Sequence, residues 1–170
     1  MHLHIDASQE GLGYLLSHPI EEDKEDSYRI QGQLVTLGSM GLSPAQSRYS
    51  TVKLEALALV HAVNKLDNYM CYCSNFRVFL DSKNLSDYMQ LNLPDIKNSR
   101  IQRMLNRLRP YAIEVTHVRV ETNYLANHLS RNPRGCPEAE EFDNYTPITI
   151  CNKSYPTISS TRRWTPRTTT

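Results

Sequence analysis

Three acidic residues occupy positions where a carboxylate is chemically unusual. Asp6 ends the apolar alternation LHI near the N-terminus, and Asp81 ends a second apolar stretch, FRVFL. Glu55 lies inside KLEALALV, the most apolar helical segment, where burying a carboxylate is unfavourable without a partner or a function. If the two strands are parallel neighbours, Asp6 and Asp81 meet at one edge of a sheet. We therefore treat the three acids as candidates for one shared site.

A divalent cation would offset the repulsion among three assembled carboxylates. Carboxylate oxygens, water and substrate phosphate are the ligands that Mg²⁺ prefers, and two-metal phosphodiester hydrolysis is the reaction that uses such a site. Each acid also has a purely structural interpretation, as a turn at Asp6, a helix cap at Asp81 or an ion pair between Glu55 and Lys53. Both interpretations stay open on the residues alone.

The elements that position these acids follow from the apolar periodicity. Five stretches alternate as strands do, and they cover residues 3–8, 11–18, 33–39, 76–82 and 112–120. Four stretches are helical, and they cover residues 42–70, 84–91, 95–111 and 122–131, the first with Ser43 as its N-cap. The order βββαβααβα predicts an α/β fold with a mixed sheet flanked by helices.

Composition divides the chain near Arg131. We predict one domain over residues 1–131 and a disordered linker or tail over residues 132–170, which is rich in Pro, Thr, Ser and Asn. The chain is 39% hydrophobic and 22% charged with a mean hydropathy of −0.53, values typical of a globular domain. No apolar run approaches the roughly 20 residues that span a bilayer, and no signal peptide is evident. We expect an intracellular, cytoplasmic protein without membrane partners.

A basic run occupies residues 97–109, KNSRIQRMLNRLR, and contains no acid. Four of its cations share a broad side at helical spacing: Lys97, Arg100, Arg103 and Arg107. The apolar residues between them form a stripe that would pack on the domain. The cations are then either contacts for nucleic-acid phosphates or an ordinary solvated face.

Four blocks of the sequence resemble the ribonuclease H domain of LTR-retrotransposon reverse transcriptases, gypsy-like elements in particular. They occur in matching order over roughly residues 3 to 131, and they read DASQEGLGYLLSH, LSPAQSRYSTVKLEALALVHAV, FRVFLDSKNL and VETNYLANHLSR. Glu55 falls on the family's catalytic glutamate and Asp81 on its third acid. Where the family's pattern has a fourth acid, this chain has Asn127.

The resemblance implies a ribonuclease H-like fold with a five-stranded mixed sheet. It also implies an endonuclease that hydrolyses the RNA strand of RNA–DNA hybrids with two Mg²⁺ ions, or Mn²⁺ in their place. Asp6, Glu55 and Asp81 would be catalytic and would bind the metals together with Asn127. The implied partners are the hybrid and the polymerase and integrase segments of a parent polyprotein, in a virus-like particle for an intact element.

Asn127 makes reduced activity an expectation. An amide oxygen can coordinate a cation but carries no negative charge, so three charges would face two metal ions instead of four. We expect weaker occupancy of the second metal. The alternative is a non-catalytic ribonuclease H-like relic or scaffold that binds nucleic acid or a protein partner.

Overall fold

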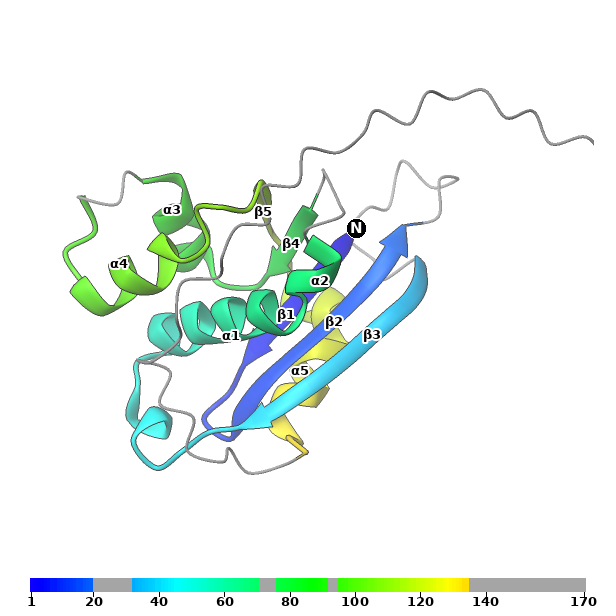
Figure 1. The fold of residues 1–170 in the computed structure, drawn as a ribbon. Coiled ribbons are helices and arrows are strands. Elements are labelled where there is room, and N and C mark those ends of the chain that lie inside the picture. Colours follow the sequence, from blue (N-terminus) through cyan, green and yellow to red (C-terminus); the bar gives the residue numbers. More distant parts are fainter. Residues whose placement is uncertain (20–31, 71–75, 92–94, 135–170) are drawn as a thin grey trace, which may run out of the picture.

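A computed structural model describes residues 1–19, 32–70, 76–91 and 95–134 of the chain (Figure 1). From residue 135 onward the predicted tail lies outside the described residues. The boundary at residue 131 therefore stays a prediction.

Five strands form one sheet in the order β3-β2-β1-β4-β5. The strands are β1 (His2–Ala7), β2 (Gly11–Pro19), β3 (Gly32–Gly41), β4 (Phe76–Leu80) and β5 (Ile113–His117). The first three form an antiparallel meander, whereas β4 runs parallel to both β1 and β5. The predicted five-stranded mixed sheet is confirmed.

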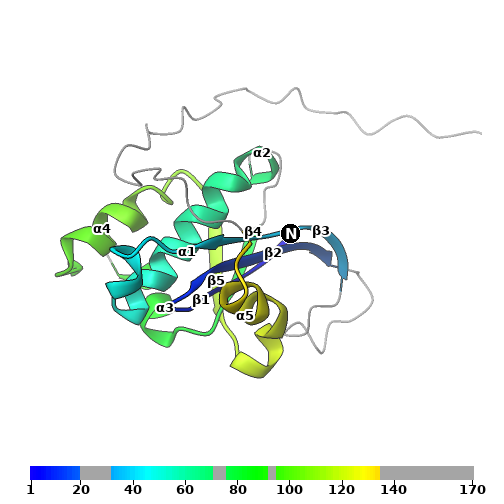
Figure 2. The same ribbon diagram turned by 90° about the horizontal axis from the view of Figure 1, so that it is seen from below.

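The main helices occupy both faces of this sheet. They are α1 (Thr51–Lys65), α3 (Lys83–Gln90), α4 (Ser99–Asn106) and α5 (Tyr124–Arg131), with a short α2 (Asp67–Met70) after α1. Figure 2 shows α5 on one face of the sheet and α1 on the opposite face. In the described part of the chain, no helix is long and apolar enough to cross a membrane.

The start of α1 differs from the prediction. Ser43 was expected to cap one helix over residues 42–70, but α1 begins at Thr51 after Ser50. Ser43 instead closes a separate turn, because its backbone N–H donates to Gln46 Oε1 at 2.9 Å and its hydroxyl accepts from the Gln46 N–H at 3.3 Å. These reciprocal bonds precede a single 3₁₀ turn, η1 (Gln46–Arg48), which separates β3 from α1.

Helix α1 forms the centre of the main core. Residues 54–63 are all buried, because the sheet covers one side of the helix while α3 and α4 pack on the other. The apolar stripe predicted for residues 95–111 takes part, since Ile101 and Leu105 on α4 and Leu108 just after it are each 4% exposed or less and belong to this cluster. Glu55 therefore lies in the buried part of this helix.

The Gly-x-Gly pair in β2 permits the close approach of α5. A Cβ atom on Gly13 would lie 2.4 Å from the carbonyl oxygen of Ala126 and 2.7 Å from the backbone nitrogen of Ser130. A Cβ on Gly11 would lie 2.7 Å from Cβ of Pro133, just beyond the helix. Any side chain at residue 13 would therefore separate the helix from the sheet.

We expect Gly13→Ala to lower the free energy of unfolding by about 1–3 kcal/mol, the usual range for overpacking. Gly38→Ala is the matched control, because its new Cβ would meet the ring end of the Tyr14 side chain, which can move. Urea denaturation of both variants measures the difference. Equal losses in the two variants would contradict close backbone packing between β2 and α5.

Candidate active site

The register of β1 and β4 brings two of the predicted acids to the same level. His4 pairs with Phe79 in this parallel ladder, and the same offset continued by two residues places Asp6 opposite Asp81. Asp6 is 8% exposed, while Asp81 is half-buried directly after β4. The parallel arrangement assumed from the sequence is therefore present.

Glu55 enters this region from α1. Its side chain is 8% exposed, and its Oε2 atom is buried without a hydrogen-bond partner in the described residues. Burial is the main cause that raises the pKa of Glu55 to about 7; a hydrogen bond with Ser82 opposes the rise, and the charges of Asp81 and Asp6 add to it. Glu55 thus lies within electrostatic range of both other acids.

Asp6 is held in a similar environment. Burial is the main cause that raises its pKa, and the neighbouring charge of Asp81 adds to the effect. The hydroxyl of Ser130 donates a hydrogen bond to Asp6 Oδ2 and partly counteracts the rise, as does the charge of Arg131. Each of the two buried carboxylates is therefore accompanied by one serine hydroxyl.

The structural roles considered for the three acids, a helix cap, a turn and an ion pair, are filled by other residues. Ser82 rather than Asp81 caps α3, since its hydroxyl accepts from the Leu85 N–H at 3.3 Å. The turn after β1 is formed by Ser8, whose hydroxyl accepts from the backbone N–H groups of residues 10 and 11. Within the described segments, the glutamate that forms an ion pair is Glu114, with Arg77, and not Glu55. Among the described residues, the turn, the helix cap and the ion pair therefore do not use the side chains of the three acids.

The donor chemistry of this group fits a divalent cation. Two of the acids are buried, their pKa values are raised mainly by that burial and also by the charge of Asp81, and one carboxylate oxygen has no hydrogen-bond partner among the described residues. No three His, Cys, Asp or Glu side chains among the described residues lie close enough to enclose a metal ion by themselves. Mg²⁺ does not require such a cage, because it usually retains water and binds through one or two carboxylates together with substrate phosphates.

Asn127, the fourth predicted ligand, lies half-buried on α5. Its backbone carbonyl accepts a hydrogen bond of 2.9 Å from the hydroxyl of Ser130, the same residue that contacts Asp6. The helix that carries Asn127 is therefore connected directly to the first acid. Coordination by the Asn127 side chain stays a prediction.

Sequence reasoning missed the polar residues that hold this site together. Asn123 is 1% exposed and donates from Nδ2 to the carbonyl oxygen of Ile5 at 2.7 Å, one residue before Asp6. Ser130 and Ser82 contact Asp6 and Glu55, as described above. The available signal was modest, because Ser82 follows Asp81 directly, while Asn123 and Ser130 belong to the VETNYLANHLSR block.

The predicted basic face is only partly a helix face. Arg103 is exposed on α4. Lys97 precedes the N-cap Asn98 and so lies outside the helix, and the prediction that it shares a helix face with the three arginines is wrong. Arg100 is half-buried, donates to the hydroxyl of Tyr49 and lies 4.9 Å from the centre of that ring. Arg107 is half-buried at the C-cap of the helix.

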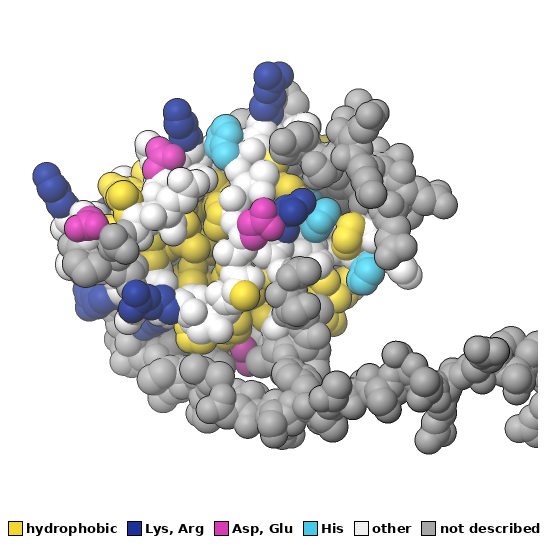
Figure 3. Space-filling model, turned by 90° about the horizontal axis from the view of Figure 1, so that it is seen from above, with side chains coloured by type: hydrophobic (Ala, Val, Ile, Leu, Met, Phe, Trp, Pro, Cys, Tyr) yellow, Lys and Arg dark blue, Asp and Glu magenta, His cyan; other side chains and the backbone are white. Residues whose placement is uncertain are grey.

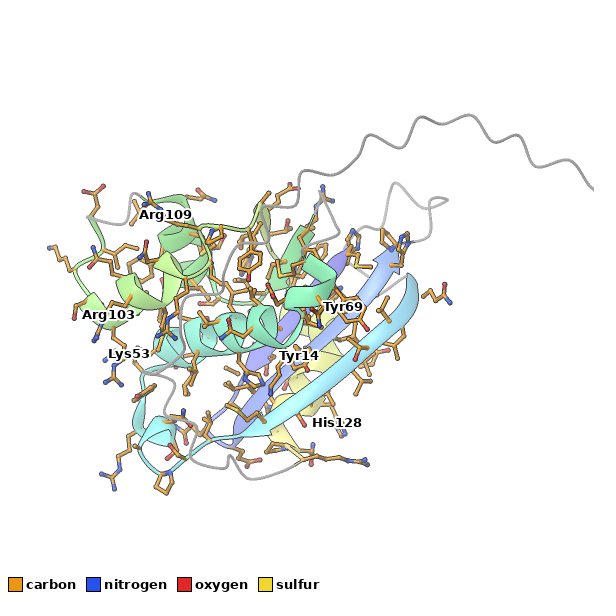
Figure 4. The ribbon with its side chains drawn as sticks, viewed as in Figure 1. Tyr14, Lys53, Tyr69, Arg103, Arg109 and His128 are labelled. Atoms are coloured by element: carbon orange, nitrogen blue, oxygen red, sulfur yellow. The ribbon has the colours of Figure 1, made fainter. Side chains whose placement is uncertain are left out.

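Figure 3 shows several Lys and Arg side chains at the left of the view, the side on which Figure 1 places α3 and α4, with Asp and Glu side chains between them. Figure 4 shows Lys53, Arg103 and Arg109 on this side, at the end of the molecule where α1 begins. Glu55 lies in the first turns of the same helix. The basic side and the carboxylates are therefore connected through the N-terminal part of α1.

Solved structures share this architecture. Ribonuclease H1 of the archaeon Halobacterium salinarum NRC-1 is 18% identical with a TM-score of 0.56, and the match covers 77% of this chain and 96% of that one. LC11-RNase H1, isolated from compost by a metagenomic approach and solved in complex with an RNA/DNA hybrid, is 14% identical with a TM-score of 0.58 over 78% and 94%. At such identities the likeness shows the fold alone, which is ribonuclease H-like.

The family follows from the sequence match. Residues 1–111 match the family described as the RNase H-like domain found in reverse transcriptase, and the chain belongs to that family. The genome polyprotein of Petunia vein clearing virus is 33% identical over 86 residues, in both the Shepherd and Hohn isolates. That match covers 51% of this chain but only 4% of the polyprotein, so the chain spans a small part of its relatives' length.

The raised pKa of Glu55 gives a test of its environment in metal-free protein. Its pKa is about 7 in the folded chain against an ordinary value of 4.5. Between these values the folded state keeps a proton that the unfolded state has lost, so stability falls as pH rises through the interval. The loss reaches at most about 3 kcal/mol at 1.36 kcal/mol per pKa unit.

We expect Glu55→Gln to remove this component, so that the variant gains stability relative to the parent as pH rises. Urea denaturation in EDTA, below and above the interval, measures the change. Glu114→Gln is the control, because that side chain is 67% exposed and pairs with Arg77 at the surface. A stability difference between parent and Glu55→Gln that does not vary with pH would contradict the assignment.

Proposed function

We propose that this domain hydrolyses the RNA strand of RNA–DNA hybrids with the help of two Mg²⁺ or Mn²⁺ ions. One observation carries the proposal: Asp6 and Asp81 lie level at one end of the parallel strands, and Glu55 of α1 lies within electrostatic range of both, with a buried Oε2 atom that has no hydrogen-bond partner among the described residues. Membership in a family of reverse-transcriptase RNase H-like domains supports the choice of reaction. The hybrid bound by the structural relative LC11-RNase H1 supports the choice of substrate.

Asp6, Glu55 and Asp81 would hold the ions, with the Asn127 amide oxygen as a fourth, uncharged ligand. The ions would supply an activated water and neutralise charge at the leaving oxygen. The chain's own residues fix the carboxylates: the hydroxyl of Ser130 restrains Asp6, and burial in α1 restrains Glu55. Such restraint favours catalysis because positioned ligands need no rearrangement when substrate binds.

Asn127 supports a second candidate function, a domain that binds nucleic acid without cleaving it. The described residues contain no closed cluster of three ligating side chains, and the fourth ligand brings no charge. A site of this kind would bind its second cation weakly. Titrating the cation in a cleavage assay therefore decides between a weakened enzyme and a binding domain.

We also propose the parent polyprotein of this domain and its location in the cell. The Petunia vein clearing virus relative is a genome polyprotein, which supports a parent polyprotein with polymerase and integrase segments. The four blocks resemble gypsy-like elements, so we assign the parent to that group and to the cytoplasm, within virus-like particles if the element is intact. The exposed cations on the α4 side would contact the hybrid's phosphates.

Cleavage of an end-labelled RNA–DNA hybrid tests the activity, with Mg²⁺ and Mn²⁺ titrated separately. We expect slow, cation-dependent cleavage by the parent and none by Asp6→Asn. Asn127→Asp should cleave faster and at lower cation concentration, because it restores a fourth negative charge. Asp87→Asn is the matched control, since the same chemical change at an exposed residue of α3 should alter nothing.

The outcomes separate the two candidate functions. Activity only in Asn127→Asp would identify an intact scaffold silenced by one amide. Absence of cleavage from every folded variant would contradict the enzyme, and hybrid binding by the same samples would then favour the binding domain.

Arg103→Gln should weaken binding to the hybrid in EDTA and reduce the slope of log K against log salt by about one, as expected for a lost phosphate contact. Lys65→Gln is the control, because it removes an exposed cation from the opposite end of α1. Fluorescence anisotropy across a salt series measures both. Equal effects of the two substitutions would show that the α4 side has no special role.

A further inference from the structure

Ser130 has a position that the proposed reaction does not explain by itself. It is fully buried, at 0% exposure, on the side of α5 that faces the sheet. Its hydroxyl donates to Asp6 Oδ2 and also lies 2.9 Å from the carbonyl oxygen of Asn127. A hydroxyl has one proton, so it can donate fully to only one of these two acceptors at a time.

The backbone around Ser130 is fixed from several directions. The hydroxyl of Ser8 donates to the carbonyl oxygen of Ser130 at 2.7 Å, which ties the end of α5 to the turn after β1. Gly13 lets the Ser130 backbone nitrogen approach the sheet, and Asn123 ties the start of the helix to Ile5. Ser130 is therefore held in register with Asp6 by contacts that do not involve its own side chain.

We propose that Ser130 is a positioning residue for Asp6 and sets the cation affinity of the carboxylate group. This inference rests on the proposed function. The hydroxyl restrains the Asp6 carboxylate, so a cation need not remove that rotational freedom when it binds. A cation on the Asp6 carboxylate would not leave this buried hydroxyl unpaired, because the Asn127 carbonyl lies 2.9 Å from it as a second acceptor.

Hydrogen-bonding partners of metal ligands commonly have such an effect, and removing one typically weakens metal affinity or activity by about 10- to 100-fold. Ser130 also links two predicted ligands, because it lies three residues after Asn127 on the same helix. A substitution at Ser130 should therefore affect the cation more than it affects the fold.

Mn²⁺ binding to metal-free protein, measured by isothermal titration calorimetry, tests the proposal without relying on activity. We expect Ser130→Ala to weaken Mn²⁺ binding by about 10- to 100-fold while the protein stays folded. Ser130→Thr keeps the hydroxyl and should recover part of the affinity. If Ser130→Ala does not fold, Ser130→Cys replaces it, because a thiol is a weaker donor of similar size.

Ser8→Ala is the control for a merely structural role. It removes a hydrogen bond to the Ser130 backbone but none to Asp6, so it should lower the melting temperature and leave Mn²⁺ affinity unchanged. Asp6→Asn provides the baseline for binding at this site. Parent-like affinity in Ser130→Ala or Ser130→Cys, or an equal loss in Ser8→Ala, would overturn the positioning role alone. Parent binding no tighter than that of Asp6→Asn would overturn both this role and the metal chemistry of the proposed function.

Discussion

The burial of two carboxylates, Asp6 and Glu55, close to the charge of Asp81 is the constraint on which the rest of the site depends. The parallel register of β1 and β4 places Asp6 and Asp81 at the same level, and Glu55 is buried on α1. Burial is the main cause that raises the pKa values of Asp6 and Glu55, and the charge of Asp81 adds to both. The cation of the proposed function would offset the unfavourable free energy of these buried charges.

Helix α5 provides the complementary restraint. It approaches β2 at Gly13, ties itself to β1 through Asn123 and Ser8, and thereby presents Ser130 to Asp6. Asn127 lies on the same helix, so one element carries both the fourth predicted ligand and the hydroxyl that restrains the first acid. The glycine pair thus affects the site indirectly, because it allows α5 to lie close enough to the sheet for Ser130 to contact Asp6.

Much of this architecture could be predicted from the sequence, because strand alternation and the placement of Asp6 and Asp81 are local patterns. The start of α1 could not, since Ser43 and Ser50 are both suitable caps and only the reciprocal bonds of Ser43 with Gln46 assign it to a separate turn. Lys97 was wrongly placed on the helix, because α4 begins only after its N-cap Asn98. Ser130 was missed because its bond to Asp6 joins residues 124 positions apart, which no local pattern reports.

The most direct test of the account is the location of Mn²⁺ by anomalous X-ray scattering from crystals soaked in that ion. The account predicts an anomalous peak among the carboxylates of Asp6, Glu55 and Asp81 that disappears in Asp6→Asn. Well-ordered crystals with no peak at these residues, or with a peak only elsewhere on the surface, would contradict it.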